Sequence, residues 1–315
     1  MTLKLLELFG GIGSPRKALI NLGIDHESID YVEIDDKAVK SYNAIFNSDY
    51  EAKSVEGYNL EVYEPLDVLV HGSPCQDFSI AGNQLGGNAE DGTRSSLLFG
   101  TIEIVKKLGE NKPKVVIWEN VKNVLSKKMK PAFDKYLQEM EHLGYSNAYE
   151  VLNAKDFGIP QARERIFVIS VLGDNQFNFD NLENKKMKDI NLFLENEVDD
   201  RYTITQPSML AKINATGTRV LKPVQDYVWT ITTKQMRCPN SGIINIGSGK
   251  HRLLTERECW RFMGFSDDDF NNAKKAHPRR KNFLNGTLYK QAGNSIVVDV
   301  LESIFKELLK QEELA

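Results

Sequence analysis

Residues 1–172 alternate short apolar runs with longer segments of helical periodicity, and this alternation restricts the fold more than any other feature of the sequence. Five runs have the length and composition of buried strands, at 3–9, 29–34, 66–72, 114–120 and 165–172. The segments at 15–23, 36–46, 96–108 and 131–144 have the spacing of amphipathic helices. Strands that alternate with helices in this way predict an α/β fold with a doubly wound, mostly parallel sheet.

The remainder of the chain has a different composition. Residues 174–200 are rich in Asn, Asp, Glu and Lys, as in a surface connection. Residues 201–250 hold short β-like runs that are broken by Pro, Gly and Asn. Helical patterns return at 255–265 and 295–310, and the second of these carries a continuous apolar stripe. This change of texture predicts a second, smaller module that contains β-structure.

The charge of the chain is divided unevenly. The 40 Lys and Arg and the 44 Asp and Glu residues give a net charge of −4. Residues 201–290, however, hold 16 Lys and Arg against six Asp and Glu, a balance of +10, which leaves −14 for the rest of the chain. Contacts to phosphates need clustered Lys and Arg, so a basic module on an acidic body favours a polyanionic partner. The alternative is a basic face that is only solvated.

The composition excludes several classes of protein. A chain of 315 residues with 41% hydrophobic and 27% charged residues is neither collagen-like nor disordered. It contains no run of eighteen apolar residues, and its N-terminal residues lack the features of a secretory signal. The three cysteines, Cys75, Cys238 and Cys259, are too few and too scattered for a disulfide framework or a metal site. We therefore expect a reduced, cytoplasmic protein with no metal and no membrane contact.

A glycine-rich turn follows the first predicted strand. Gly11 and Gly13 lie where glycines let a ligand approach backbone N–H groups closely. Glu33 ends the second strand, a position from which a carboxylate commonly binds ribose hydroxyls. The spacing is not G-x-G-x-x-G, because Ser14 and Arg16 occupy the places near the third glycine. The pattern indicates a nucleoside ligand, and S-adenosylmethionine fits it at least as well as a nicotinamide dinucleotide.

Polar residues also gather at the ends of the other strands. Cys75 follows the strand at 66–72, between a rigid Pro and polar neighbours that are poor core material. Glu119 ends the next strand, and Arg163 and Arg165 begin the last one, two residues apart and so on one face. Arginines near a thiol lower its pKa below the ~8.5 of a free cysteine. A thiol, a carboxyl group and two guanidinium groups at one sheet edge indicate a site that holds and activates a polar ring.

At these residues the chain resembles the DNA (cytosine-5) methyltransferases of bacterial or phage type, over nearly its whole length and with the family's motifs in order. The motif F-x-G-x-G is Phe9–Gly13, and the acid of the second strand is Glu33. The motif P-C-Q is Pro74–Gln76, E-N-V is Glu119–Val121 and Q-x-R-x-R is Gln161–Arg165. Near the C-terminus, R-x-L-T-x-R-E-C is Arg252–Cys259 and Q-x-G-N-S is Gln291–Ser295. One departure is the family's third-strand Asp, which is absent from residues 52–59. Ser54, Val55 and Glu56 are unassigned candidates for its place.

The resemblance implies S-adenosylmethionine as the cofactor and S-adenosylhomocysteine as its product. The cofactor-binding residues that it implies are Phe9, Gly11, Gly13, Glu33, Ile34, Pro74, Leu97, Asn294 and Ile296. Together with the apolar stripe at 295–310, the Q-x-G-N-S motif implies a catalytic and cofactor-binding domain of residues 1–172 plus 292–315. Residues 173–291 would then form the target-recognition domain.

The expected catalysis follows from the chemistry of the pyrimidine ring. Carbon 5 of cytosine is a poor nucleophile, and addition of the Cys75 thiolate to carbon 6 turns it into an enamine carbon. The resemblance implies that Glu119 bonds ring nitrogen 3 and the amino group, while Arg165, with Arg163 nearby, binds the carbonyl oxygen. Loss of the carbon 5 proton and elimination of the thiolate then restore aromaticity. Because the target carbon is inaccessible inside a duplex, the cytosine must be rotated out.

The basic region between Arg165 and Arg252 is predicted to read DNA, since the run W-T-I-T-T at 229–233 resembles the family's Thr-Leu pair. The predicted DNA-binding residues are Gln76, Ser79, Thr230, Thr232, Lys234 and Arg237. We expect a monomer that acts on double-stranded DNA, with a cognate restriction endonuclease as a partner in function but not in physical contact. The alternatives are an RNA cytosine-5 methyltransferase, an inactive DNA-binding relative, and a nicotinamide-dependent oxidoreductase, which only the glycine turn and Glu33 support.

Overall fold

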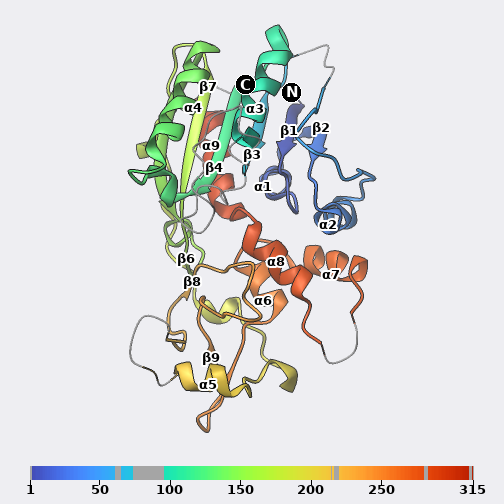
Figure 1. Cartoon of the computed structure of the whole chain (residues 1–315), viewed down its shortest axis with the longest axis vertical. Coiled ribbons are helices and arrows are strands. Elements are labelled where there is room, and N and C mark those ends of the chain that lie inside the picture. Colours follow the sequence, from blue (N-terminus) through green and yellow to red (C-terminus); the bar gives the residue numbers. More distant parts are fainter. Residues whose placement is uncertain are drawn as a thin grey trace.

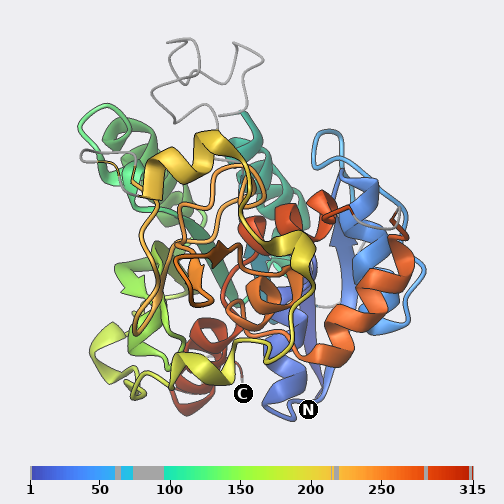
Figure 2. The same cartoon turned by 90° about the horizontal axis from the view of Figure 1, so that it is seen from below.

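The computed structural model describes residues 2–60, 65–73, 96–213, 215, 220–279, 283–311 and 314. Its larger part, in the upper half of Figure 1, is a β-sheet with helices on both faces, and both ends of the chain lie there. The smaller part below it holds short strands and helices joined by irregular segments. Figure 2 looks onto the smaller part from below, where its yellow and orange segments lie in front of the sheet.

The larger part contains the strands β1 (Leu3–Leu8), β2 (His26–Val32), β3 (Val68–His71), β4 (Val115–Val121), β5 (Tyr145–Asn153) and β7 (Glu164–Leu172). Its helices are α1 (Ser14–Asn21), α2 (Asp36–Phe46), α3 (Ser96–Leu108), α4 (Lys130–His142) and α9 (Val298–Lys310). The smaller part and its connections contain β6 (Gln161–Ala162), β8 (Val228–Trp229), β9 (Ile244–Asn245), β10 (His251–Arg252), α5 (Pro207–Ile213), α6 (Glu256–Arg261), α7 (Asp267–Ala276) and α8 (Gly286–Asn294).

The central sheet has the strand order β2-β1-β3-β4-β7-β5. The four strands β2, β1, β3 and β4 run parallel to one another, whereas β7 lies between β4 and β5 and runs antiparallel to both. A short connection through residues 154–163 joins β5 to β7, and antiparallel strands need no helix to cross the sheet between them. The predicted α/β fold with a doubly wound, mostly parallel sheet is therefore confirmed.

Alternate side chains of the strands enter two apolar cores, one on each face of the sheet. Leu5 and Ile117 belong to the core that includes residues of α1 and α9. Leu6 and Trp118 belong to the core that includes residues of α3 and α4. The C-terminal helix α9 contacts α1 and buries Leu301 completely, as its apolar stripe predicted. Strands that are buried on both faces explain why the sequence shows them as continuous apolar runs.

The five predicted strands all occur, and each boundary lies within three residues of the predicted one. The sequence pattern did not predict β5, because this edge strand leaves most of its side chains half-buried or exposed and has few apolar residues. It also did not predict α7, whose many polar residues hide its helical period. The start of α7 is nevertheless a capping box, in which Ser266 and Asp269 each bond the other's backbone N–H.

Part of the 173–291 segment packs on the larger part of the molecule. Helix α7 contacts α2, and Lys17 of α1 forms a mostly buried ion pair with Asp269 of α7 at 2.7 Å. Trp260 and Phe262, in and after α6, belong to the same apolar core as α9. Helices α6 to α8 therefore form the junction between the two parts, as Figure 1 shows. The predicted domain boundaries stay a prediction.

Glu7 of β1 is an ionisable side chain inside this fold. It is fully buried, and it accepts a hydrogen bond from the Tyr42 hydroxyl at 2.6 Å. Burial raises the pKa of Glu7 from 4.5 to about 7, while Tyr42 and Arg16 act in the opposite direction. An acid whose pKa is raised in the folded state destabilises the fold as the pH rises from 4.5 toward 7, because only the unfolded chain releases the proton there.

Replacement of Glu7 by Gln should therefore stabilise the protein above pH 7 and flatten its stability between pH 4.5 and 7. The raised pKa corresponds to at most about 3 kcal/mol. Thermal unfolding across this pH range measures the effect. Glu27→Gln is the matched control, since Glu27 is exposed on the neighbouring strand β2 and its replacement should leave the wild-type profile. A Glu7→Gln variant that keeps the wild-type pH dependence would contradict the assignment.

Candidate active site

The carboxyl ends of the parallel strands meet at the edge of the sheet that faces the smaller part (Figure 1). Glycine and polar residues lie at these ends: Phe9–Gly13 after β1, Glu33 after β2, Gly72 and Ser73 after β3, and Glu119 near the end of β4. Because β7 is antiparallel, it begins where they end, and Arg165 of β7 pairs with Val121 of β4. The topology therefore gathers the predicted cofactor and catalytic residues at one edge.

A cavity of about 1080 Å³ opens along this edge. Its volume lies at the upper end of the range for ligand pockets, roughly 300–1,000 Å³. The residues that line it come from both parts of the molecule and include Phe9, Gly11, Ile12, Glu33, Ile34, Asp35, Ser54, Val55, Glu56, Leu97, Glu119, Asn120, Arg163, Arg165, Thr233, Arg237, Lys290, Gly293 and Asn294. One continuous space thus joins predicted cofactor residues such as Gly11 and Glu33 to three of the predicted catalytic residues, Glu119, Arg163 and Arg165.

The Glu33 carboxylate fixes the glycine turn. It accepts the Gly11 N–H at 3.1 Å and the Asp35 N–H at 2.9 Å, and burial raises the pKa of Glu33 although these two donors lower it. A Cβ at Gly11 (φ 56°) would meet no atom within 4 Å, so this glycine serves the turn and the approach of a ligand. A Cβ at Gly13 would lie 2.3 Å from the Phe46 ring. Gly13 therefore serves the packing of α1 against α2 and does not line the cavity.

Apolar side chains line the same half of the cavity. Ile34 is 72% exposed and lies on the cavity wall, next to the position of Glu33. An apolar surface beside a few fixed polar groups suits a flat, partly polar ring. The segment that lacks the predicted Asp also reaches the cavity, because Ser54, Val55 and Glu56 all line it. The structure therefore keeps all three as candidates for the missing contact.

Glu119 and Arg165 form the charged centre of the catalytic half. The Arg165 Nε lies 3.2 Å from the Glu119 Oε1, and both side chains are mostly buried. Burial raises the pKa of Glu119, while Arg165 and then Arg163 act against that rise. A carboxyl group with a raised pKa keeps its proton to higher pH than a free glutamate does, and the guanidinium beside it can bind a developing negative charge.

Arg163 lines the same cavity, but its guanidinium donates to backbone carbonyls. Its Nη1 donates to Ile231 O at 2.9 Å, and its Nη2 donates to Gly293 O at 3.1 Å and Ser295 O at 2.8 Å. Burial and the charge of Arg165 lower the pKa of Arg163. These contacts join the segment after β8 to the Q-x-G-N-S segment. A catalytic role for Arg163 beside Arg165 stays a prediction.

Four predicted site residues lie outside the described residues: Pro74, Cys75, Gln76 and Ser79. The chain leading to them is described as far as Ser73, which is buried beside the cavity. The Ser73 hydroxyl accepts the Trp118 Nε1–H at 3.1 Å, and its carbonyl accepts the Asn120 amide at 3.4 Å. Trp118 and Asn120 flank Glu119 in β4, so these contacts attach the start of the cysteine segment next to the acid. Sequence reasoning quoted Asn120 in a motif without giving it this role.

The two described cysteines are separate from the cavity. Cys259 is fully buried in α6, and burial raises the pKa of its thiol, whereas Cys238 is exposed. The described residues contain no group of His, Cys, Asp and Glu side chains that could hold a metal ion. They also contain no helix with the length and apolar character that crossing a membrane requires.

Three of the four predicted DNA-binding residues that follow β8 lie between residues 232 and 237. Arg237 lines the cavity, Lys234 is exposed outside its lining, and Thr232 is half-buried. Thr233, which was not predicted, also lines the cavity. This segment packs closely on the Q-x-G-N-S motif, because a Cβ at Gly293 would lie 2.3 Å from the Thr233 N and 2.4 Å from the Thr232 carbonyl carbon.

The other residue predicted to face DNA, Thr230, lies beside Arg165. Both line a shallow groove of about 370 Å³ that shares Val121 and Arg165 with the main cavity. The Thr230 hydroxyl donates to the Ala162 carbonyl at 2.9 Å, next to the pairing of β6 with β8. In this structure the hydroxyl therefore supports the junction of the two parts, and its contact with DNA stays a prediction.

The two predicted cofactor-binding residues nearest the C-terminus differ in their position relative to the cavity. Asn294 lines the cavity, whereas Ile296 does not, and the Ile296 carbonyl accepts a hydrogen bond from the Ser14 hydroxyl of α1 at 2.9 Å. Two lining residues were missed by sequence reasoning, Asp35 and Lys290, whose charged groups pair at 2.6 Å. Asp35 could have been found from its place at the N-cap of α2, but no pattern in the sequence points to Lys290.

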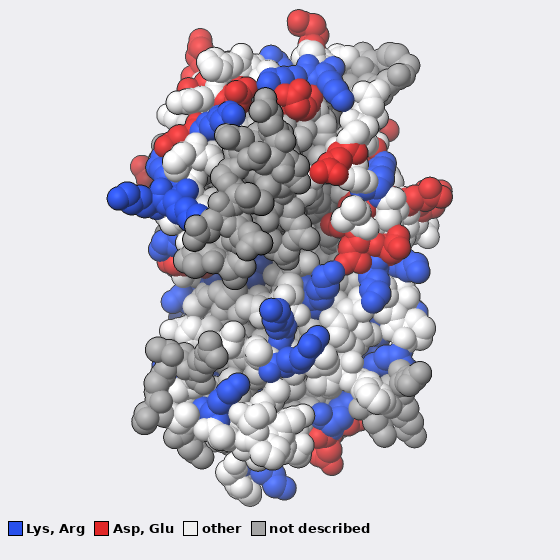
Figure 3. Space-filling model, viewed as in Figure 1, with Lys and Arg blue, Asp and Glu red and all other residues white. Residues whose placement is uncertain are grey.

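On the face that Figure 3 shows, the smaller part is mainly basic. The lower half of Figure 3 shows Lys and Arg side chains with few acidic ones, whereas the upper half carries both signs. Lys222, Lys234, Arg237 and Lys250 are among its exposed residues. This distribution agrees with the +10 balance of residues 201–290 and places a positive surface beside the cavity.

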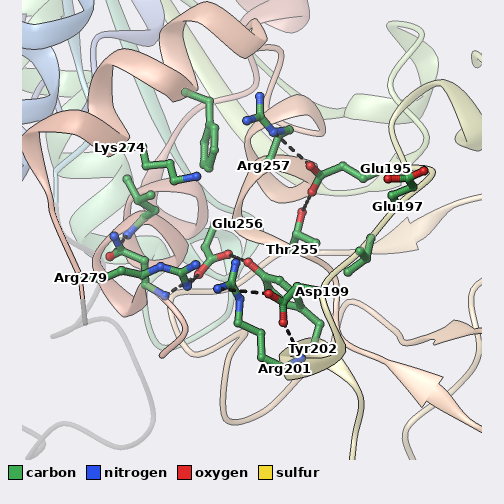
Figure 4. Close-up of a pocket in the computed structure, with 14 residues that line it drawn as sticks. Glu195, Glu197, Asp199, Arg201, Tyr202, Thr255, Glu256, Arg257, Lys274 and Arg279 are labelled. Carbon is green, nitrogen blue, oxygen red and sulfur yellow. Dashed lines mark hydrogen bonds and ion pairs between the residues drawn. The ribbon is translucent and has the colours of Figure 1, made fainter. Parts of the chain in front are cut away.

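A second cavity of about 190 Å³ lies within the smaller part, where acidic and basic side chains face one another (Figure 4). Arg257 pairs with Glu195 at 3.1 Å, and Glu256 accepts a hydrogen bond from the Tyr202 hydroxyl and pairs with Arg279 at 3.7 Å. None of the residues predicted for catalysis or for the cofactor lines it. Because these charges satisfy one another, we interpret the cavity as part of the contact between the 195–202 segment and helices α6 and α7.

Comparison with known proteins identifies the family of the chain. Residues 3–310 match the family described as C-5 cytosine-specific DNA methylase. The type II methyltransferase M2.ScrFI of Lactococcus lactis subsp. cremoris is 34% identical, over 98% of this chain and 100% of its own length. The type II methyltransferase M.HhaI of Haemophilus parahaemolyticus is 33% identical, over 96% and 93%. The crystal structure of the S. pombe Dnmt2 methyltransferase shares the fold, with a TM-score of 0.76, 20% identity and coverage of 98% of this chain and 99% of that one.

Replacement of Gly293 by Ala should destabilise the protein, because the added Cβ would overlap backbone atoms of Thr232 and Thr233 that cannot rotate away. Overpacking of this kind costs about 1–3 kcal/mol. Chemical denaturation measures the free energy of unfolding. Gly286→Ala, at the start of the same helix, is the matched control, since its Cβ would have Met236 as its neighbour at an ordinary 3.6 Å. Equal stability of the two variants would show that the close approach is not needed.

Proposed function

The chain belongs to the C-5 cytosine-specific DNA methylase family and is a DNA (cytosine-5-)-methyltransferase, and we propose that it takes its methyl group from S-adenosylmethionine. The acceptor is carbon 5 of a cytosine that is rotated out of double-stranded DNA, within a short fixed sequence. The observation that carries this proposal is the buried Glu119–Arg165 pair, which shares one cavity with the glycine turn at Gly11.

The cofactor half of the cavity suits S-adenosylmethionine. Glu33 presents a fixed carboxylate to ribose hydroxyls, and the exposed Ile34 offers an apolar surface to adenine. The open space around Gly11 lets the backbone approach the ligand, and Asn294 reaches the cavity from the C-terminal segment. When bound there, S-adenosylmethionine supplies an electrophilic methyl group. The proposed binding residues that line the cavity are Phe9, Gly11, Glu33, Ile34, Leu97 and Asn294.

The catalytic half suits the chemistry of a pyrimidine. In this proposal the Cys75 thiolate forms a bond to carbon 6, and the displaced electron pair makes carbon 5 nucleophilic. Glu119, with its raised pKa, donates a proton at ring nitrogen 3 as negative charge develops, and Arg165 binds the carbonyl oxygen. Transfer of the methyl group to carbon 5 leaves S-adenosylhomocysteine. The carbon 5 proton then passes to water, its electron pair re-forms the double bond to carbon 6, and the bond from carbon 6 to sulfur breaks with its electrons returning to Cys75. Ring nitrogen 3 returns its proton to Glu119, which restores the acid.

The smaller part is proposed to hold the DNA. Its basic surface would contact phosphates, and Arg237, which lines the cavity, would lie near the rotated base or its neighbours. In this division residues 1–172 plus 292–315 carry the chemistry and 173–291 carry recognition, with α6 to α8 as the junction. The type II relatives make a restriction endonuclease the proposed partner in function, acting beside a monomeric methyltransferase.

The family match affects two of the alternative functions predicted from the sequence differently. The family match replaces the nicotinamide-dependent oxidoreductase, which also left Cys75 and Glu119 without a role. An RNA substrate is the remaining competitor within the same chemistry. Parallel assays of methyl transfer to duplex DNA and to tRNA distinguish the two, and we expect transfer to duplex DNA.

Methylation of genomic DNA followed by bisulfite sequencing should reveal 5-methylcytosine in one short, fixed sequence context. Cys75→Ser should abolish the signal while leaving binding of cofactor and DNA largely intact, because a hydroxyl is a far weaker nucleophile near pH 7. DNA with 5-fluorocytosine at the target should trap the wild type covalently, since fluorine cannot leave as a proton does. Product methylated at N4 of cytosine, or substantial activity of the serine variant, would refute the proposed mechanism.

A pair of variants should separate the two halves of the cavity. Arg237→Ala should weaken discrimination between DNA sequences by about 5- to 150-fold without altering the affinity for S-adenosylmethionine, because a good base contact contributes about 1–3 kcal/mol. Glu33→Ala should do the reverse and weaken cofactor binding only. Competition between cognate and altered duplexes measures the first effect, and calorimetry measures the second. If Arg237→Ala changed cofactor affinity and left sequence preference intact, the proposed division would be wrong.

A further inference from the structure

The carbonyl group of Gly11 is held by a side chain that belongs to none of the motifs. The Tyr31 hydroxyl, from β2, donates a hydrogen bond to the Gly11 carbonyl at 2.6 Å. The N–H of the same glycine donates to Glu33, just after β2, at 3.1 Å. The carbonyl and the N–H of Gly11 are therefore both fixed, by Tyr31 in β2 and by Glu33 just after it.

Fixing this carbonyl also orients the next N–H group. In a planar trans peptide the C=O and the following N–H point in opposite directions. Since the Gly11 carbonyl is turned toward Tyr31, the N–H of Ile12 is directed away from Tyr31. Ile12 lines the cavity, and its N–H makes no hydrogen bond to the described part of the chain. An N–H in this position is a donor for a ligand that approaches the turn.

Tyr31 is itself held by close packing. It is fully buried, and its ring stacks on Tyr42 of α2 with the ring centroids 3.8 Å apart. A Cβ at Gly10 would lie 2.5 Å from the Tyr31 ring, so the absence of a side chain at Gly10 makes room for this ring. The Tyr42 hydroxyl in turn donates to the buried Glu7 of β1 at 2.6 Å. Two stacked tyrosines therefore connect the first strand to the turn that follows it.

We propose that Tyr31 is a positioning residue for the cofactor, which holds the Gly11 turn in the conformation that binds S-adenosylmethionine. This role rests on the proposed use of S-adenosylmethionine by the same cavity. Tyr31 does not line the cavity, so it acts through the Gly11 backbone and leaves the reacting atoms untouched. The effect of removing its hydroxyl should accordingly fall on cofactor binding and spare the methyl-transfer step.

Tyr31→Phe tests this role with little disturbance, because it keeps the stacked ring and removes one donor. Tyr50→Phe is the matched control. Its ring belongs to the same cluster, with its centroid 5.5 Å from that of Tyr31, but its hydroxyl donates to the Ser28 carbonyl at 3.1 Å. Each variant loses one hydroxyl from the same aromatic cluster, and only Tyr31→Phe frees the Gly11 carbonyl. Calorimetric titration with S-adenosylmethionine and with S-adenosylhomocysteine, and steady-state kinetics on cognate duplex DNA, supply the readouts.

Tyr31→Phe should raise the Kd of both ligands by about two- to tenfold, the range that one lost hydrogen bond produces. The KM for S-adenosylmethionine should rise by a similar factor, while kcat and the KM for DNA stay near wild type. Tyr50→Phe should match the wild type in all five quantities. Wild-type affinity in Tyr31→Phe, or an equal loss in both variants, would overturn the positioning role. A wild-type protein that binds neither ligand would instead refute the proposed function of the cavity.

Discussion

The antiparallel pairing of β7 with β4 puts Arg165 opposite Val121 and Phe167 opposite Glu119, and the geometry of the catalytic half depends on that register. Residues two apart in a strand share a face, so Glu119 and Arg165 become diagonal neighbours on one side of the ladder. A shift of one residue would turn Arg165 to the opposite face of the sheet. The 3.2 Å contact between the carboxylate and the guanidinium is thus a product of strand pairing.

A few side chains connect the smaller part of the molecule to the edge of the sheet that holds Glu119 and Arg165. The guanidinium of Arg163 donates to three carbonyls that are distant from it in the sequence, those of Ile231, Gly293 and Ser295. Gln161 also contacts the smaller part. Its Nε2 donates to the Phe262 carbonyl at 2.8 Å, and its Oε1 accepts the Ile231 N–H at 3.1 Å. Buried polar groups that are satisfied by backbone atoms fix relative position well, since each unmade bond would leave a desolvated group. The smaller part is thereby held against the cavity by two residues that lie just before Arg165 in the chain.

The sequence predicts most of the sheet and the centre of the site, because buried strands and strand-end motifs are local patterns. It does not predict β5, an edge strand with little apolar content, or the antiparallel course of β7, which depends on pairing partners far along the chain. For the same reason the motif Q-x-R-x-R predicts that Arg163 lies near Arg165, and only long-range contacts show that Arg163 is engaged by backbone carbonyls. Tyr31 and Lys290 belong to no motif, and only the folded chain brings them to the turn and the cavity.

The two glutamates at the cavity show how surroundings assign different roles to one residue type. Burial raises the pKa of both Glu33 and Glu119. Glu33 accepts two backbone N–H groups, which favour its charged form and fix its oxygens in direction. Among the described residues no backbone donor to Glu119 opposes its burial, and its charged form is favoured chiefly by Arg165. A ligand that competes for the guanidinium would weaken this support and favour protonation of Glu119. Glu33 is therefore suited to be a permanent acceptor, and Glu119 is suited to gain a proton as a polar ring binds Arg165.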